Sequence, residues 1–181
     1  MLYKPIRVAN IMKIETMTLK VGNVTRAVAS YSYDDIGRLV SLKRSGNVGV
    51  VNYAYNIRNW LKEMKSDRFS QNLWYETTGA YPCFNGNISR LQWQSGKDNV
   101  LRGYDFIYDG LNRLEESAYG EGADLSQSKS HYSEHVLSYS PNGSIERLQR
   151  YAKKNNGTFG LIADLTYAYN GNQIKSISDK K

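Results

Sequence analysis

The stretch Tyr33–Leu39, which reads YDDIGRL, returns almost unchanged as YDGLNRL at Tyr108–Leu114. Two looser versions are YNIRNWL at Tyr55–Leu61 and YSPNGSI at Tyr139–Ile145. The residue four places after each tyrosine is Gly or Asn, and these residues occupy positive φ at the lowest cost. A phrase repeated along one chain indicates a repeated structural unit.

Each phrase is typical of a tight turn between two strands. The aromatic residues before it alternate, as at Tyr31 and Tyr33, so the two rings share one face of a strand. Asp34 suits the first position of the turn because its side chain can accept backbone N–H groups. Gly37 then closes the turn in the left-handed region. The unit is therefore strand, tight turn, strand.

Two further stretches contain Asn-Gly-Asn, the strongest short signal for a hairpin, and they lie at Phe84–Ile88 and Tyr169–Ile174. A type I′ turn there needs positive φ at both central residues. The residues that we expect to build turns are Asp34, Gly37, Asn59, Asn85, Gly86, Asp109, Asn112, Gly143, Asn170 and Gly171.

After most turns come an apolar residue, two others and a second apolar residue, as at Leu39 and Leu42, whereas Leu114 is followed by Ser117. In a regular strand, residues three apart point to opposite faces. The pattern therefore predicts strands that are partly covered on both sides.

Together these patterns predict an all-β fold, an antiparallel meander of repeated β-hairpins that forms a twisted, coiled open sheet. The fifteen tyrosines suit strands. We expect one domain over residues 1–181, with an atypical N-terminal segment at 1–17 and polar loop insertions at 120–135 and 153–160. An open sheet has two unpaired edges. We therefore expect protein partners there, either a second copy or the remainder of a longer chain.

The phrase Tyr-Asp-x-x-Gly-Arg-Leu resembles the signature of the Rhs/YD-repeat family. YDDIGRL matches it outright, and YDGLNRL matches with Asn for Gly. With GNVTR at 22–26 and FNGNIS at 84–89, the resemblance extends over roughly residues 15–180 and is to Bacteroidetes-type repeat proteins in particular. It implies coiled antiparallel sheets, an extracellular or cell-surface location, and repeats that bind carbohydrate.

The chain departs from the large members of that family, in which the sheet closes into a shell around a toxin. It is too short to close a shell, and it lacks the Pro- and Asp-rich core that performs self-cleavage. The resemblance is therefore to a short or truncated module, without the shell and autoprotease roles. The sequence shows no signal peptide, because charges are spread through residues 1–20, and no apolar run long enough to span a membrane.

The stretch HYSEH at His131–His135 matches H-x-x-E-H, a zinc signature of peptidases. It works only on a helix, where His131 and His135 share a face and Glu134 acts as base. Here a loop-like SQSKS precedes it and a strand-like VLSY follows. We therefore interpret it as coincidence and expect no catalytic residue, metal or cofactor. The single Cys83 excludes an intrachain disulfide.

Turn and strand physics explain every recurring residue, so the sequence predicts a non-catalytic structural or interaction module. The alternative is a carbohydrate-binding module whose rings stack on sugars, with Trp74, Tyr75, Trp93 and Tyr104 as candidates. The net charge of +7 can attract nucleic acid. The lysines and arginines are scattered, however, as on protected sheet edges, so we expect no nucleic-acid partner.

Overall fold

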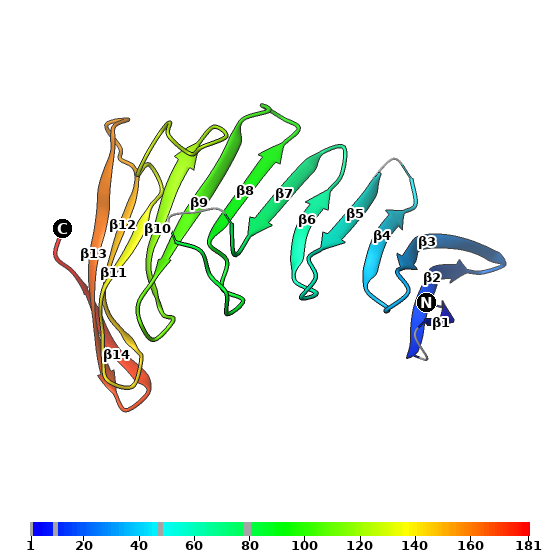
Figure 1. Cartoon of the computed structure of the whole chain (residues 1–181), viewed down its shortest axis with the longest axis horizontal. Helices are drawn as coiled ribbons and strands as arrows, with labels where there is room; N and C mark the ends of the chain where they lie inside the picture. Colours follow the sequence, from blue (N-terminus) through cyan, green and yellow to red (C-terminus); the bar gives the residue numbers. More distant parts are fainter. Residues whose placement is uncertain (1, 9–10, 47–48, 78–80) are drawn as a thin grey trace. The chain divides into compact units, whose positions relative to one another are not determined.

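The computed structural model describes residues 2–8, 11–46, 49–77 and 81–181, and every regular element in these ranges is a β-strand (Figure 1). The strands are β1 (Leu2–Val8), β2 (Ile11–Val21), β3 (Val24–Tyr33), β4 (Leu39–Arg44), β5 (Val50–Tyr55), β6 (Leu61–Lys65), β7 (Phe69–Trp74), β8 (Arg90–Ser95), β9 (Leu101–Tyr108), β10 (Leu114–Glu121), β11 (Glu134–Tyr139), β12 (Ile145–Lys153), β13 (Phe159–Asn170) and β14 (Gln173–Asp179). They are hydrogen-bonded in chain order from β1 to β14, in an antiparallel sheet. The predicted all-β antiparallel meander is confirmed.

The chain divides into two compact units. The first comprises Met1–Asn72 and Ser95–Asp98, and the second comprises Leu73–Gln94 and Asn99–Lys181. The hairpins β1–β2, β3–β4 and β5–β6 belong to the first unit, and β9–β10, β11–β12 and β13–β14 belong to the second.

Each of these hairpins carries a β-bulge. In β3–β4, Tyr33 pairs with Leu39 and Tyr31 pairs with Leu42, so β4 has one residue more than β3 over the same length. Tyr31 and Tyr33 share a face, and their partners therefore share it too. The expectation that the two apolar residues face opposite sides is wrong, because it assumed a regular strand. The same spacing holds for Leu61 and Met64, and for Ile174 and Ile177.

The buried core is small. Among the described residues, the buried apolar side chains are Ala29, Tyr119 and Leu125. Tyr119 is the centre of an aromatic cluster in the second unit, with edge-to-face contacts to Tyr104 at 5.5 Å and Tyr132 at 5.1 Å between ring centroids. Most strand residues are only half-buried, so cross-strand contacts within and between hairpins hold much of the structure.

Of the polar segment predicted at 120–135, residues 122–133 lie between β10 and β11. Leu125 from this loop packs where Gly103 and Gly120 face each other across β9 and β10. A Cβ atom at Gly120 would lie 2.2 Å from the backbone oxygen of Leu125. Only glycine therefore admits the loop at this place.

The segments at 153–160 and 84–88 differ from the expectation. Residues 154–158 form a tight hairpin turn between β12 and β13 rather than an inserted loop, and Gly157 N donates to the Lys154 oxygen at 2.9 Å. The sequence did not reveal this turn, because Lys154 stands at the position that aspartate occupies in the repeated phrase. Residues 84–88 form no hairpin and belong to the connection between β7 and β8. Of the atypical segment at 1–17, Leu2–Val8 form β1 and residues 11–17 belong to β2.

Candidate functional site

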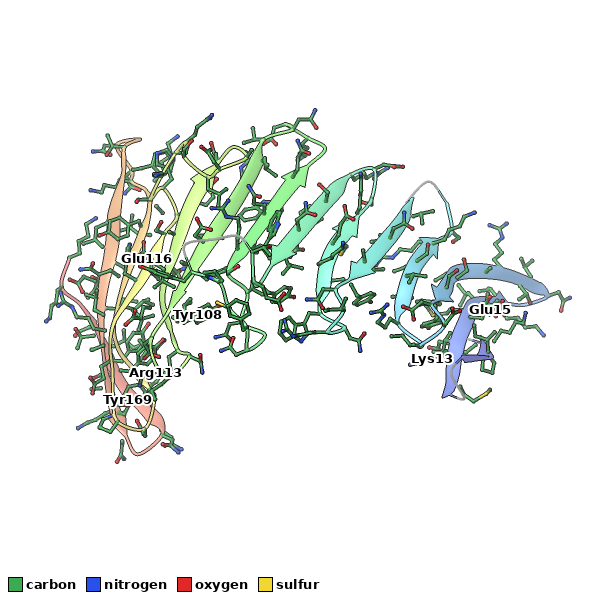
Figure 2. The ribbon with its side chains drawn as sticks, viewed as in Figure 1. Lys13, Glu15, Tyr108, Arg113, Glu116 and Tyr169 are labelled. Carbon is green, nitrogen blue, oxygen red and sulfur yellow. The ribbon has the colours of Figure 1, made fainter. Side chains whose placement is uncertain are left out.

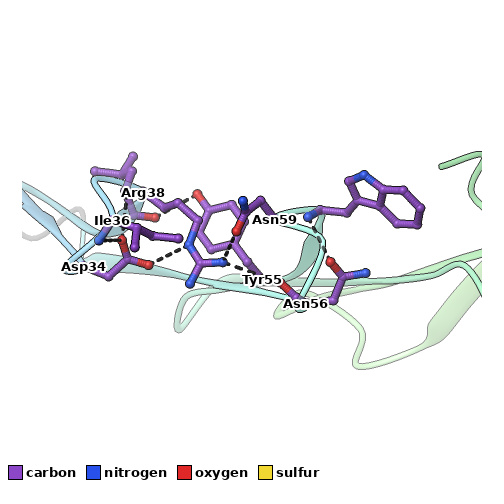
Figure 3. Close-up of polar contacts among 8 residues, drawn as sticks. Asp34, Ile36, Arg38, Tyr55, Asn56 and Asn59 are labelled. Atoms are coloured by element: carbon purple, nitrogen blue, oxygen red, sulfur yellow. Dashed lines mark hydrogen bonds and ion pairs between the residues drawn. The ribbon is translucent and has the colours of Figure 1, made fainter. Parts of the chain in front are cut away.

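The turn after β3 shows how the repeated phrase folds (Figure 3). The Asp34 N–H donates to the Arg38 carbonyl at 2.9 Å, and the Gly37 N–H donates to the Asp34 carbonyl at 2.9 Å. The Asp34 Oδ1 accepts the backbone N–H groups of Ile36 at 3.2 Å and Arg38 at 2.8 Å. The carboxylate thus replaces a hydrogen-bonding partner that the turn itself cannot supply.

The same pair of backbone hydrogen bonds recurs in the other turns, which begin at Asn56, Asp109, Ser140 and Lys154. The fourth residue of each turn has positive φ, which the sequence predicted at Gly37, Asn59, Asn112 and Gly143 but not at Gly157. The values are 86° at Gly37, 65° at Asn59, 64° at Asn112, 85° at Gly143 and 84° at Gly157.

The Asn-Gly-Asn stretches adopt other conformations. Asn170 pairs with Gln173, so Gly171 and Asn172 form a two-residue loop. Positive φ is found at Gly171 but not at Asn172, which is the pattern of a type II′ turn, so the type I′ prediction is wrong. In the other stretch, Gly86 has a φ of 100° and the Asn85 Oδ1 accepts the Asn87 N–H at 3.0 Å.

Arginine at the end of the phrase joins one hairpin to the next. The Arg38 Nε donates to the Asp34 Oδ2 at 2.6 Å, and the guanidinium carbon lies 4.9 Å from the centre of the Tyr55 ring. Its Nη1 donates to the Asn59 Oδ1 at 2.7 Å. Figure 3 shows the guanidinium held between these groups. The sequence interpretation gave the arginine no role, because the contact involves a residue of the next hairpin.

The same arrangement, an arginine bonded to the turn aspartate and stacked on the tyrosine of the next hairpin, recurs in the second unit. The Arg113 Nε donates to the Asp109 Oδ2 at 2.6 Å, and its guanidinium carbon lies 4.4 Å from the centre of the Tyr139 ring. The backbone N–H of Arg113, together with its side chain, holds the pKa of the Asp109 carboxyl below its usual value. The aspartate therefore stays ionised and fixes the arginine.

Tyrosine hydroxyls make a second link between successive segments. Each donates to a backbone carbonyl of the preceding segment, and the pairs are Tyr33 with Ile14, Tyr55 with Leu39, Tyr108 with Ile88, Tyr139 with Leu114 and Tyr169 with Ile145. Four of the acceptors, Ile14, Leu39, Leu114 and Ile145, directly precede a bulge residue. A bulge disrupts the regular ladder, so a hydroxyl from the next hairpin can serve the carbonyl beside it.

This link explains why the phrase begins with tyrosine and not phenylalanine. Burial raises the pKa of Tyr33, Tyr55, Tyr108 and Tyr139. The hydroxyls therefore remain protonated donors. Figure 2 shows Tyr108, Arg113 and Tyr169 toward the turn ends of their hairpins.

The four ring candidates for carbohydrate binding are all half-buried. Trp93 and Tyr104 stack on one another, with 5.6 Å between ring centroids, and both are half-buried. The Tyr104 hydroxyl donates to the Tyr132 carbonyl at 3.2 Å. Trp74 ends β7, and Tyr75 begins the connection after it, with burial raising its pKa. Carbohydrate binding stays a prediction.

The H-x-x-E-H residues do not lie on a helix. His131 is in the loop before β11 and stacks on Phe159, with 3.6 Å between ring centroids. Glu134 and His135 open β11, where the Glu134 Oε1 accepts the Arg150 Nε at 2.7 Å. Adjacent residues of a strand point to opposite faces, so this geometry is not that of the peptidase motif.

Ion pairs also join neighbouring strands. Arg90 makes two hydrogen bonds to Asp105, at 2.6 and 2.7 Å, and Arg147 makes two to Asp164, at 2.9 and 2.6 Å. The Arg147 hydrogen bonds lower the pKa of Asp164 to about 2. These groups are engaged with each other, which favours a structural role over acid–base chemistry.

In the described ranges, no helix has the length and apolar character needed to cross a membrane. No family model matches the chain, and no curated protein matches it. Among solved structures, a chain in the crystal structure of TcdB2-TccC3-Cdc42 is similar, with 12% identity, a TM-score of 0.48, and coverage of 93% of this chain and 10% of that one. A chain in a Photorhabdus luminescens Tc holotoxin pore, with a mutation in TccC3, is similar with 12% identity, a TM-score of 0.41 and the same coverage.

The chain thus spans a tenth of the length of these two solved chains. At such identity and TM-score the likeness carries no argument about function. The assignment of the fold rests on the strand order and hydrogen bonding of this chain.

Proposed function

We propose that this chain is a non-catalytic structural module that joins hairpins of YD-repeat type into a sheet and pairs with protein partners at its strand edges. The observation that carries the proposal is the recurring tyrosine hydrogen bond from one hairpin to the carbonyl of the preceding segment. The aspartate stabilises the turn and the arginine stacks on the next tyrosine. The main residues of the repeated phrase therefore all have a part in building the sheet.

The edge strand β14 supports the second half of the proposal. Ile174 and Ile177 follow the last turn and are 57% and 53% exposed. Their counterparts in the preceding hairpin, Ile145 and Leu148, are half-buried, because β13 follows that hairpin. Another hairpin placed against β14 would cover the two isoleucines in the same way. The partner that fits this edge is a hairpin of the same type, from a second copy or a longer chain.

The resemblance to the Rhs/YD-repeat family adds an extracellular or cell-surface setting to the proposal. It rests on the phrase itself, whose aspartate, arginine and tyrosine all take part in contacts between or within the hairpins.

Sedimentation equilibrium over a range of protein concentrations tests the edge. We expect the mean mass to rise with concentration and the double variant I174K/I177K to reduce that rise, because two buried lysines oppose strand pairing. The matched control is I36K, since Ile36 is equally exposed at 57% but lies in a turn. A strictly monomeric wild type would refute pairing with a second copy. Substrate turnover that D109N abolishes in a folded protein would refute the non-catalytic role.

A further inference from the structure

The five linking tyrosines differ in what covers their rings. The residue directly before each carbonyl acceptor is Lys13, Arg38, Asn87, Arg113 or Ser144, in chain order. Wherever this residue is cationic, its charge lies over the ring of the tyrosine that donates. The distances to the ring centres are 5.9 Å for Lys13 over Tyr33, 4.9 Å for Arg38 over Tyr55 and 4.4 Å for Arg113 over Tyr139.

Tyr108 lacks this cover. The residue in the equivalent place is Asn87, whose side chain is too short to reach across the ring. Its Nδ2 is buried and has no hydrogen-bond partner among the described residues. In the part of the chain that the structure describes, no lysine or arginine lies over the Tyr108 ring.

A pocket of about 510 Å³ is lined by both Asn87 and Tyr108. Its lining also includes Asp109 and Asn112, together with Tyr81 and Phe84. The last two are large aromatic residues that are 62% and 68% exposed. Aromatic walls attract a cation through the negative face of the ring.

The polar groups favour a guanidinium over an ammonium group. Arg38 donates to the Asn59 Oδ1 as well as stacking on the next tyrosine. The equivalent amide oxygen in the pocket is Asn112 Oδ1, which accepts the Asn85 Nδ2 at 2.6 Å and, as an amide oxygen, has a second lone pair with which to accept another donor. A planar guanidinium can stack and donate at once, whereas an ammonium is a compact point charge. Asp109 also lines the pocket, but its carboxylate is already paired with Arg113, so the carboxylate is not the group that selects a guanidinium.

We propose that the pocket over Tyr108 binds a guanidinium group, as an arginine side chain of a partner polypeptide. This site adds to the proposed interaction role. Only the statement that the arginine belongs to a partner polypeptide rests on that proposed function. It does not involve the strand edges.

Nuclear magnetic resonance titration with Nα-acetyl-arginine amide tests the site directly. We expect saturable shifts of the Asn87 side-chain amide and of the Tyr108 backbone amide. Alkylation of Cys83, the single thiol, which lines the pocket, should slow about twofold at half occupancy. Nα-acetyl-citrulline amide has the same shape without the charge and should give no saturable shift. The lysine analogue should bind more weakly.

The variant N87R should fill the pocket from within the chain and abolish the response to the arginine probe. The matched control is S144R, because Ser144 directly precedes the carbonyl acceptor of Tyr169 as Asn87 precedes that of Tyr108. This variant should keep the response to the arginine probe. Equal shifts with citrulline would refute a cation site, and equal binding of the lysine probe would refute a guanidinium site. An unchanged response in folded N87R would place the probe elsewhere. If the arginine probe does not bind but the protein still self-associates, the guanidinium site is refuted and the proposed pairing at the strand edges is not.

Discussion

The hydroxyl link can be tested at Tyr55, because its neighbour Tyr53 offers a matched control on the same face of β5. The Tyr55 hydroxyl donates to the Leu39 carbonyl at 2.9 Å. The Tyr53 hydroxyl makes no such hydrogen bond to a residue that the structure describes. Y55F keeps the ring and therefore keeps its stacking with Arg38, 4.9 Å away. The substitution thus removes one hydrogen bond between hairpins and little else.

A hydrogen bond of this kind contributes about 0.5–1.5 kcal/mol, and the part-buried Leu39 carbonyl can regain some of the loss from water. We expect Y55F to lower the free energy of unfolding by about 1 kcal/mol, which is a drop in Tm of about 2–4 °C for a chain of this size. Y53F should change it by less than about 0.5 kcal/mol. Y55L also removes the stacked ring and should cost at least about 0.5 kcal/mol more than Y55F.

Urea unfolding gives the free energies, and amide hydrogen exchange shows where the effect lies. Repeat proteins can open hairpin by hairpin, so the loss of protection in Y55F should be concentrated in β3–β6. Equal costs for Y55F and Y53F would refute the argument, since the hydroxyl would then contribute nothing. Uniform loss of protection along the chain would contradict a local link.

Three further predictions concern single positions. G37V should cost more than N112G, because valine at a φ of 86° is strained by about 1–2 kcal/mol whereas glycine relieves the strain of asparagine at 64°; equal losses in urea unfolding would refute the turn geometry. G120A should cost about 1–3 kcal/mol through displacement of the loop that packs on it, whereas a Cβ at Gly110 meets nothing within 4 Å and G110A should be nearly neutral; proteolysis within residues 122–133 should rise only in the former. The contribution of the ionised Asp164 should be complete above its unfolded pKa of about 3.9 and lost as pH falls through its folded pKa of about 2; acid unfolding of D164N should lack this dependence, and identical acid profiles would contradict it.

The turns were predictable because their determinants are local. Asp34 and Gly37 are four or fewer residues from the atoms that they contact, and both side-chain chemistry and positive φ are written in the phrase. The turn that ends at Gly157 was missed because lysine stands at its first position. The Asn-Gly signal at 85–86 misled because a hairpin needs a strand on each side, and that pairing depends on residues outside the signal.

The roles of arginine and tyrosine were not predictable from one phrase. Arg38 contacts Tyr55, and the Tyr55 hydroxyl contacts Leu39, so both contacts depend on how two hairpins lie against each other. The bulge was likewise not predictable from one phrase. It places Leu39 and Leu42 on one face, and the sequence signal for it, a step of three between apolar residues, is also compatible with a helix or a regular strand.

The sequence by itself determined the class of fold, the repeated hairpin and most of its turns, since these follow from the conformational limits of Gly and Asn and the side-chain period of a strand. The tertiary structure alone decided which groups link the hairpins, where the sheet edge stays uncovered, and which of the linking tyrosine rings lack a cation. The physical reason is distance along the chain. The arginine, the tyrosine and the carbonyl become neighbours only when one hairpin pairs with the next. The absence of a cation at Asn87 can be recognised only by comparison with Lys13, Arg38 and Arg113 at the equivalent positions.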